Sequence, residues 1–250
     1  MALRCYTMAI VGLYIWSYLV GAVPTAYLIG RLAKGIDLRH YGSGNVGGTN
    51  LFYHIGKGWL VPLGFFEIFL KGASPIWIGR YLLGMELPWP LHVGTSHYLL
   101  GREQPLAVLL VAPLLAIAGN NWSAYLKFQG GRGIAVVSGT LLALSPLLLL
   151  AFIAVALAGW VLTRSSAVWV LISLALLPLW TYVSGEPGVV TWYCGGVLAL
   201  VVLKRLLSNW TPFPAGLPRK KVLFNRLFRD RDLDDRDQWV KRVSRGPDNN

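Results

Sequence analysis

Long apolar runs separated by short polar or glycine-rich segments dominate the chain. The runs lie at about residues 8–30, 58–83, 105–120, 133–163, 166–184 and 188–206. An α-helix needs about 20 mainly apolar residues to cross a bilayer, and most of these runs approach or exceed that length. The pattern therefore predicts an all-α, polytopic integral membrane protein.

The first run, from about Met8 to Gly30, has some features of a secretory signal. However, its apolar part extends beyond the usual length of about 7 to 15 residues. It also holds Pro24 midway and shows no obvious cleavage site. We therefore expect this run to be retained as the first membrane span.

The run at 133–163 is longer than one crossing requires, and Ser145-Pro146 interrupts it. Proline lacks a backbone N–H and clashes with the preceding turn, so it kinks or ends a helix. Division at this point gives about seven transmembrane helical elements. The fourth, about 133–145, is short, so we expect it to be tilted or buried among its neighbours.

Basic residues in the loops indicate which side of the membrane each loop faces. The loop at 84–104 carries Arg102 against Glu86 and Glu103, whereas the first loop is more basic, with Arg31, Lys34, Arg39 and Lys57 against Asp37. By the positive-inside rule the first loop is cytoplasmic, which places the N-terminus outside. Seven elements then place the basic C-terminal tail inside, whereas six would place it outside.

Composition supports the membrane assignment. The chain is 55% hydrophobic, only 14% charged and has a mean hydropathy of +0.53, whereas about 25% of the residues in soluble domains are charged. The net charge is +12, and 12 of the 23 Lys and Arg residues lie between Lys204 and Arg245. That position beside the last run favours anionic membrane lipids as partners and argues against nucleic acid. We expect a membrane-embedded domain at 1–208 and a basic cytoplasmic tail at 209–250.

The two cysteines, Cys5 and Cys194, lie in or beside apolar runs and lack metal-ligand spacing. The sequence thus indicates neither a disulfide framework nor a zinc site. We expect no metal and no cofactor.

The polar segment between the first two runs is rich in glycine and in small hydrogen-bonding side chains. It reads Tyr41-Gly42-Ser43-Gly44-Asn45-Val46-Gly47-Gly48-Thr49-Asn50. It has too little apolar area for core packing, whereas its glycines let backbone N–H groups turn toward one oxyanion. Ser43, Asn45, Thr49 and Asn50 supply further hydrogen-bonding groups. The segment predicts a phosphate-binding loop; the alternative is a loop that only connects two spans.

A second glycine cluster, Gly130-Gly131-Arg132-Gly133, leads directly into an apolar run. The start of a helix favours an anion through its unpaired N–H groups and its dipole, and Arg132 and Lys127 add positive charge. Lys71 lies inside the second apolar run, where a lysine faces either a polar interior or ligand, or reaches out to the headgroups. Both clusters fall in cytoplasmic loops, so we expect them to form one pocket at the inner membrane surface.

These residues resemble the bacterial acyl-phosphate-dependent glycerol-3-phosphate acyltransferases, the PlsY family. The resemblance covers roughly residues 8–205 and rests on Ser43-Gly44-Asn45-x-Gly47-x-Thr49-Asn50, Lys71-Gly72-Ala73, Gly119-x-Asn121-Trp122 and Lys127-Phe128-x-Gly130-Gly131-x-Gly133. It implies a multi-pass enzyme of the bacterial inner membrane whose active site faces the cytoplasm. Its substrates would be acyl phosphate and glycerol 3-phosphate, and the acyl group would go to the 1-position, giving lysophosphatidic acid.

The resemblance also implies roles for individual residues. Ser43, Asn45 and Arg132 would be the catalytic residues. The substrate-binding residues would be Gly44, Gly47, Thr49, Asn50, Lys71, Lys127, Gly130, Gly131 and Gly133. A serine nucleophile is not implied, because a phosphate oxygen of the substrate can take the hydroxyl proton.

The chain departs from the family pattern at several positions. Tyr53 stands in place of an arginine, Asn120 in place of a histidine and Arg132 in place of a lysine. The His-Arg-x-Asn string after the last span is not recognisable, and Asn209 or Asn225 could substitute for it. Two functions therefore stay open: an active acyltransferase, or a catalytically lapsed paralogue that binds a lipid phosphate or regulates a partner. A transporter is disfavoured, because paired broken spans are expected there and only one break is found.

Overall fold

The structure is a computed structural model that describes residues 2–42, 44–85, 106–214, 216–235 and 238–239. These residues form helices and loops, with no β-strand among them. The α-helices are α1 (Ala2–Ala22), α2 (Thr25–Lys34), α3 (Gly48–His54), α4 (Leu60–Phe65), α5 (Ser74–Trp77), α6 (Leu106–Asn121), α7 (Ile134–Leu144), α8 (Pro146–Thr163), α9 (Ser166–Val183), α10 (Gly188–Leu207) and α11 (Arg219–Phe224). Three segments are π-helical. Segment η3 (Phe66–Ala73) joins α4 to α5, and η4 (Ile78–Leu82) continues α5, so that the four form one long element. Segment η7 (Asn225–Arg229) extends α11.

The predicted all-α membrane architecture is confirmed. Among the described residues, five helical stretches are long and apolar enough to span a bilayer: Arg4–Lys34, Lys57–Leu82, Pro146–Thr163, Ser166–Val183 and Gly188–Trp210. Two shorter apolar helices, α6 and α7, fall at the predicted third and fourth elements. The number of complete crossings stays a prediction.

The break predicted at Ser145-Pro146 is confirmed. Helix α7 ends at Leu144, Ser145 is extended with φ −157° and ψ 108°, and α8 begins at Pro146. Proline suits the first position of a helix, because the N–H that it lacks would have no intrahelical partner there. The short α7 is largely buried, as expected for an element that cannot cross a membrane alone.

Glycines let the membrane helices approach one another closely. Helix α1 packs along α6, and η3 packs along α7. In the second pair, a Cβ added at Gly139 would collide with the carbonyl of Ile68, and one added at Gly72 would collide with that of Val136. Small residues at helix crossings allow this backbone-to-backbone packing inside a membrane, where apolar burial between helices gives little driving force.

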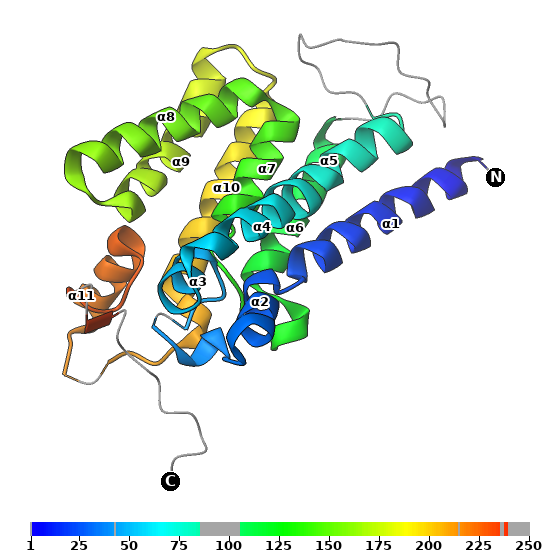
Figure 1. Ribbon diagram of the computed structural model, residues 1–250. Helices are drawn as coiled ribbons and strands as arrows, with labels where there is room; N and C mark the ends of the chain where they lie inside the picture. Colours follow the sequence, from blue (N-terminus) through cyan, green and yellow to red (C-terminus); the bar gives the residue numbers. More distant parts are fainter. Residues whose placement is uncertain (1, 43, 86–105, 215, 236–237, 240–250) are drawn as a thin grey trace.

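The first glycine-rich loop, between α2 and α3, and the C-terminal segment lie at one end of the helical bundle. Figure 1 shows α2, α3 and α11 at the end of the bundle opposite the N-terminus. A small apolar cluster there supports the first glycine loop, with Ala26, Leu38, Val46, Leu51 and Leu63 at its centre. The candidate site lies at this end.

Candidate functional site

A cavity of about 410 Å³ opens between the two glycine clusters and the long element that contains η3. Its polar lining residues are Asn45, Gly47, Gly48, Thr49, Asn50, Glu67, Asn120, Gly131, Arg132, Gly133, Ser138 and Asp230. Its apolar lining residues include Leu60, Leu63, Ile68 and Ile134. The structure thus brings the two clusters together around one pocket that is lined by both polar and apolar residues.

The first glycine loop is held in shape by Asn50. The buried Asn50 amide donates hydrogen bonds to the carbonyls of Leu38 and Tyr41, each at 2.9 Å, and to that of Asn45 at 3.1 Å. The Asn50 side chain therefore fixes the backbone that surrounds Asn45.

Asp37 and Arg39 form a charged pair just before the same loop. Burial raises the pKa of Asp37, but hydrogen bonds from Arg39, one of them at 2.6 Å, outweigh burial and hold this pKa below its usual value. Asp37 is therefore ionised at neutral pH and ties Arg39 to the loop, away from the cavity.

The second loop depends on its glycines for close packing. A Cβ at Gly130 would collide with the carbonyl of Asn120, and one at Gly131 would lie 2.8 Å from the carbonyl oxygen of Val46. The N–H of Gly131 donates to the carbonyl of Asn120 at 2.9 Å. Gly133 has a φ of +74°, in the left-handed region that favours glycine, and is the N-cap of α7.

Asn209 joins the two loops. Its amide nitrogen donates to the carbonyl of Gly44 at 3.2 Å and to that of Gly130 at 3.0 Å. Its amide oxygen accepts from the N–H of Gly130 at 3.0 Å and from Nζ of the fully buried Lys204. One side chain at the end of α10 thus bonds both glycine clusters.

Arg132 lies at the same junction and is only 9% exposed. One terminal nitrogen donates to the carbonyl of Lys204 at 2.9 Å, the other contacts the hydroxyl of Ser208 at 3.5 Å, and Nε lies 2.7 Å from Oδ1 of Asp230. The side-chain amide of Asn45 is oriented so that both polar atoms make hydrogen bonds. Its oxygen accepts from Nε of Arg132 at 3.1 Å, and its nitrogen donates to the carbonyl of Gly130 at 2.8 Å.

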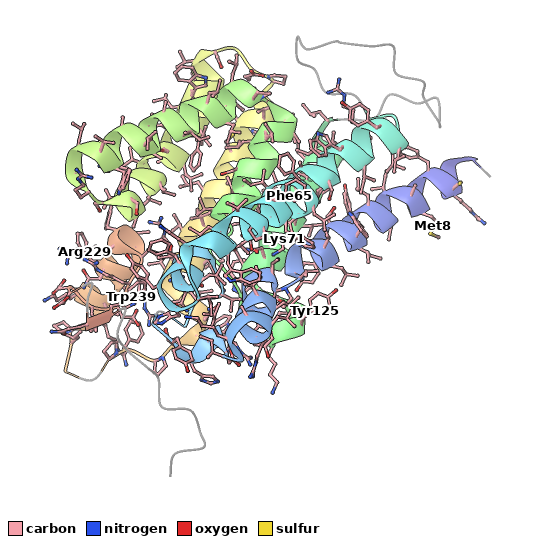
Figure 2. All side chains as sticks on the ribbon, in the orientation of Figure 1. Met8, Phe65, Lys71, Tyr125, Arg229 and Trp239 are labelled. Carbon is pink, nitrogen blue, oxygen red and sulfur yellow. The ribbon has the colours of Figure 1, made fainter. Side chains whose placement is uncertain are left out.

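Lys71 lies behind the cavity wall and not in it. The side chain is 1% exposed, and its Nζ lies 3.2 Å from Oε1 of Glu67 and 3.1 Å from Oδ1 of Asn120. Figure 2 labels Lys71 in the middle of the helical bundle, whereas Arg229 and Trp239 lie with the C-terminal segment. Lys71 therefore acts on the cavity through Glu67 and Asn120, the two side chains that line it.

Two helices begin at the cavity. Gly47 precedes α3 and Gly133 precedes α7, and among the residues that the structure describes neither helix start has a side-chain cap. Unpaired N–H groups and the positive end of the helix dipole favour an anion at such a position, most clearly at the longer α7. Within the described part of the chain, no group of three or more His, Cys, Asp or Glu side chains could hold a metal ion.

The residues predicted from the sequence fall into four groups. Those that line the cavity are Asn45, Gly47, Thr49, Asn50, Gly131, Arg132 and Gly133. Gly44 and Gly130 are sequence neighbours of lining residues and bond Asn209, and Lys71 bonds the lining residues Glu67 and Asn120. Lys127 is exposed and borders a separate groove with Tyr27, Arg39 and Tyr125. Ser43 lies outside the described residues.

Several contributors were not predicted. Lys204 could have been flagged as Lys71 was, because it is a lysine inside an apolar run. Glu67 lies four residues before Lys71, the spacing at which helical side chains meet. Asp230 and Trp239 line the cavity from the tail, and nothing in that charged stretch distinguishes them.

Position 53, where the sequence departs from the motif pattern, does not supply a cation to the cavity. Tyr53 is 38% exposed, and neither it nor His54 is among the cavity residues. Burial lowers the pKa of His54, and the nearby Lys34 lowers it further, so His54 is neutral at pH 7. Arg132 is therefore the cation that lines this cavity among the described residues.

Known proteins are similar to this chain over most of its length. The family model described as glycerol-3-phosphate acyltransferase matches residues 11–213. Glycerol-3-phosphate acyltransferase 4 of Dehalococcoides mccartyi strain CBDB1 is 35% identical over 231 residues, with 90% of each chain covered. Glycerol-3-phosphate acyltransferase 5 of strain ATCC BAA-2266 / KCTC 15142 / 195 is 34% identical, with 98% of this chain and 96% of that protein covered.

The fold is also similar to solved structures. A crystal structure of PlsY, an integral membrane glycerol 3-phosphate acyltransferase, in its glycerol 3-phosphate form is 28% identical and superposes with a TM-score of 0.66. It covers 78% of this chain and 88% of that one. The lysophosphatidic acid form is 26% identical and has a TM-score of 0.64.

The junction at Asn209 generates a prediction about stability. Asn209 has a φ of 55°, which glycine tolerates, so Asn209→Gly removes the side chain without adding backbone strain. The variant leaves Gly44, Gly130 and Lys204 with fewer partners, at a cost of about 1–3 kcal/mol for each buried polar group that stays unsatisfied. We expect a clearly lower midpoint of thermal unfolding in detergent, whereas Gln238→Ala on the exposed tail should leave it unchanged. Equal midpoints for Asn209→Gly and the unaltered protein would show that the junction does not stabilise the fold.

Proposed function

The chain belongs to the glycerol-3-phosphate acyltransferase family, and we propose on this basis that it transfers a fatty acyl group from acyl phosphate to the 1-hydroxyl of glycerol 3-phosphate. The products are lysophosphatidic acid and inorganic phosphate. The observation that carries the proposal is that both glycine clusters, Arg132 and apolar helix residues line the same cavity.

The mixed lining of the cavity suits the two ends of the substrates. Leu60, Leu63 and Ile68 line the cavity and belong to a candidate membrane span, so they offer the acyl chain an apolar surface. The phosphates bind at Arg132 and the start of α7, which favour anions. This arrangement holds an amphipathic donor with its carbonyl group near the glycine loops.

The proposed reaction needs no covalent intermediate. The 1-hydroxyl oxygen attacks the carbonyl carbon of acyl phosphate and forms the ester bond. The bond from that carbon to the bridging phosphate oxygen then breaks, and the phosphate leaves with the electron pair and accepts the hydroxyl proton. Acyl phosphate is an activated donor, so the protein has to orient the hydroxyl and stabilise the developing negative charge.

We assign the residues accordingly. Arg132 holds the phosphate of glycerol 3-phosphate, and the family resemblance assigns Asn45 and Ser43 to the acyl phosphate and its carbonyl oxygen. Gly130 and Gly131 shape the loop, because their N–H groups already bond Asn209 and Asn120. Thr49 and Ser138 offer further hydroxyl groups at the cavity wall.

The experiment that tests the function is a transfer assay with purified protein in detergent. Palmitoyl phosphate with radiolabelled glycerol 3-phosphate should give labelled lysophosphatidic acid and an equal amount of inorganic phosphate, and palmitoyl-CoA should give little product. Ser43→Ala should abolish product formation and serves as the inactive control. No product from palmitoyl phosphate, with a protein that unfolds normally, would favour the catalytically lapsed paralogue.

We also propose that the cavity opens at the cytoplasmic face of the bacterial inner membrane, with the N-terminus outside. The support is the excess of basic residues in the first loop and after the last span. Glycerol 3-phosphate does not cross bilayers, so inverted vesicles should form product from added glycerol 3-phosphate and intact spheroplasts should not. The opposite pattern would reverse the orientation.

Arg132 generates a kinetic prediction. Hydrogen bonds to a charged group contribute about 1.5–3 kcal/mol, and 1.4 kcal/mol corresponds to a factor of ten. Arg132→Ala should therefore raise the KM for glycerol 3-phosphate about ten- to a hundredfold, whereas Arg132→Lys, which keeps the charge, should stay active.

The matched control is Arg164→Ala, because Arg164 is an exposed arginine outside the cavity. Its KM should equal that of the unaltered protein. An unchanged KM in a folded Arg132→Ala variant would remove Arg132 from the phosphate site.

A further inference from the structure

The C-terminal segment folds back onto the site, although it lies beyond the part of the chain that the family model matches, residues 11–213. Segment η7, which continues α11, packs against α9 and α10 at the end of the bundle that holds the cavity (Figure 1). The segment is fastened by Arg226, which is 2% exposed. Its side chain bonds Asp232 at 2.6 Å, the carbonyl of Thr211 at 2.9 Å and that of Leu206 at 3.2 Å.

This segment places the carboxylate of Asp230 beside Arg132, the residue proposed to bind phosphate. Asp230 follows η7 with a φ of 54°, and its Oδ1 lies 2.7 Å from Nε of Arg132. Trp239 lines the cavity from the same segment. The tail therefore forms part of the site wall.

The Arg132–Asp230 contact is an ion pair without a directed hydrogen bond. Oδ1 of Asp230 is buried and accepts no hydrogen bond from the described residues, although Nε of Arg132 is near. The direction of the Nε–H explains this, because the amide oxygen of Asn45 lies 3.1 Å from the same nitrogen. Asp230 is thus held by charge alone at this contact, and an anion that makes aligned hydrogen bonds to the guanidinium can replace it.

The guanidinium still has donors for such an anion. Each terminal nitrogen carries two N–H groups. In the described part of the structure, one nitrogen bonds the carbonyl of Lys204 and the other makes a long contact with Ser208. A phosphate that approaches these nitrogens from the cavity meets the negative charge of Asp230 beside them, and like charges at this range repel.

We propose that Asp230 is a further residue that sets the specificity of the site, because it competes with the phosphate of glycerol 3-phosphate for Arg132. This inference rests on the proposed function of the cavity. The competition lowers the affinity for any anionic ligand, and the dianionic phosphate competes better than a monoanion. By linkage, a bound phosphate loosens the hold of Asp230 on Arg132 to the same extent.

The test compares two variants that remove one negative charge each from the tail. Asp230→Asn is nearly isosteric, and Asn tolerates a positive φ, so the local backbone is kept. Asp235→Asn is the matched control, because Asp235 is exposed on the same segment and outside the cavity. Both variants change the long-range charge equally, and only the first removes the contact with Arg132.

Asp230→Asn should lower the KM for glycerol 3-phosphate about three- to tenfold, with kcat within about twofold of the unaltered value. Asp235→Asn should leave both constants unchanged. Asp230→Gly, which also suits the positive φ, should shift the KM in the same direction and covers the case that the first variant folds poorly. A merely structural role for Asp230 would instead lower kcat and the midpoint of thermal unfolding.

A second measurement separates this inference from the proposed function. Binding of inorganic phosphate to the purified protein, followed by calorimetry without any acyl donor, should be tighter in Asp230→Asn by the same factor. If the unaltered protein forms no product while this tightening is seen, the proposed function fails, but the competition between Asp230 and phosphate for Arg132 is supported. If the protein forms product but Asp230→Asn leaves phosphate affinity and KM unchanged, or weakens them, the inference is overturned.

Discussion

The bonds made by Asn209 hold the candidate site together. This side chain bonds the backbone of Gly44 and Gly130 and accepts a hydrogen bond from the buried Lys204. The two loops are about 85 residues apart in sequence and share no strand or helix. Their relative position is fixed by the hydrogen bonds from Asn209 to both backbones and by the bond from the N–H of Val46 to the carbonyl of Gly130. Asn209 does not line the cavity itself, but it holds the two loops that do.

The low-dielectric surroundings explain why so many charges at this junction are paired. A buried cation costs several kcal/mol unless hydrogen bonds or opposite charges compensate it. Lys71 meets Glu67 and Asn120, Lys204 meets Asn121 and Asn209, and Arg132 meets Asp230. In each case the partner comes from a different loop or turn, or lies one helical turn away. The bonds made by Lys71, Lys204 and Arg132 therefore also fix the position of the segments around the cavity.

The sequence predicted the helices well, because apolar run length and Pro146 act locally. It also predicted that the two glycine clusters would lie together, because loop charge places both on one side of the membrane. The individual hydrogen bonds and ion pairs of the site were not predictable. Asn50 was expected to meet a ligand, yet its amide is used by three backbone carbonyls. Asp230 lies among several acidic residues of the tail, and only the fold shows which of them reaches Arg132.

We propose that Arg132 binds the phosphate of glycerol 3-phosphate in the cavity between the glycine loops. The most direct measurement is an experimental structure of the protein with glycerol 3-phosphate bound. We expect phosphate oxygens about 2.7–3.2 Å from the terminal nitrogens of Arg132, with the carboxylate of Asp230 displaced from Nε. The proposal would be contradicted by a phosphate bound instead in the neighbouring cavity lined by Arg164, Arg205 and Arg229, with Arg132 still paired to Asp230.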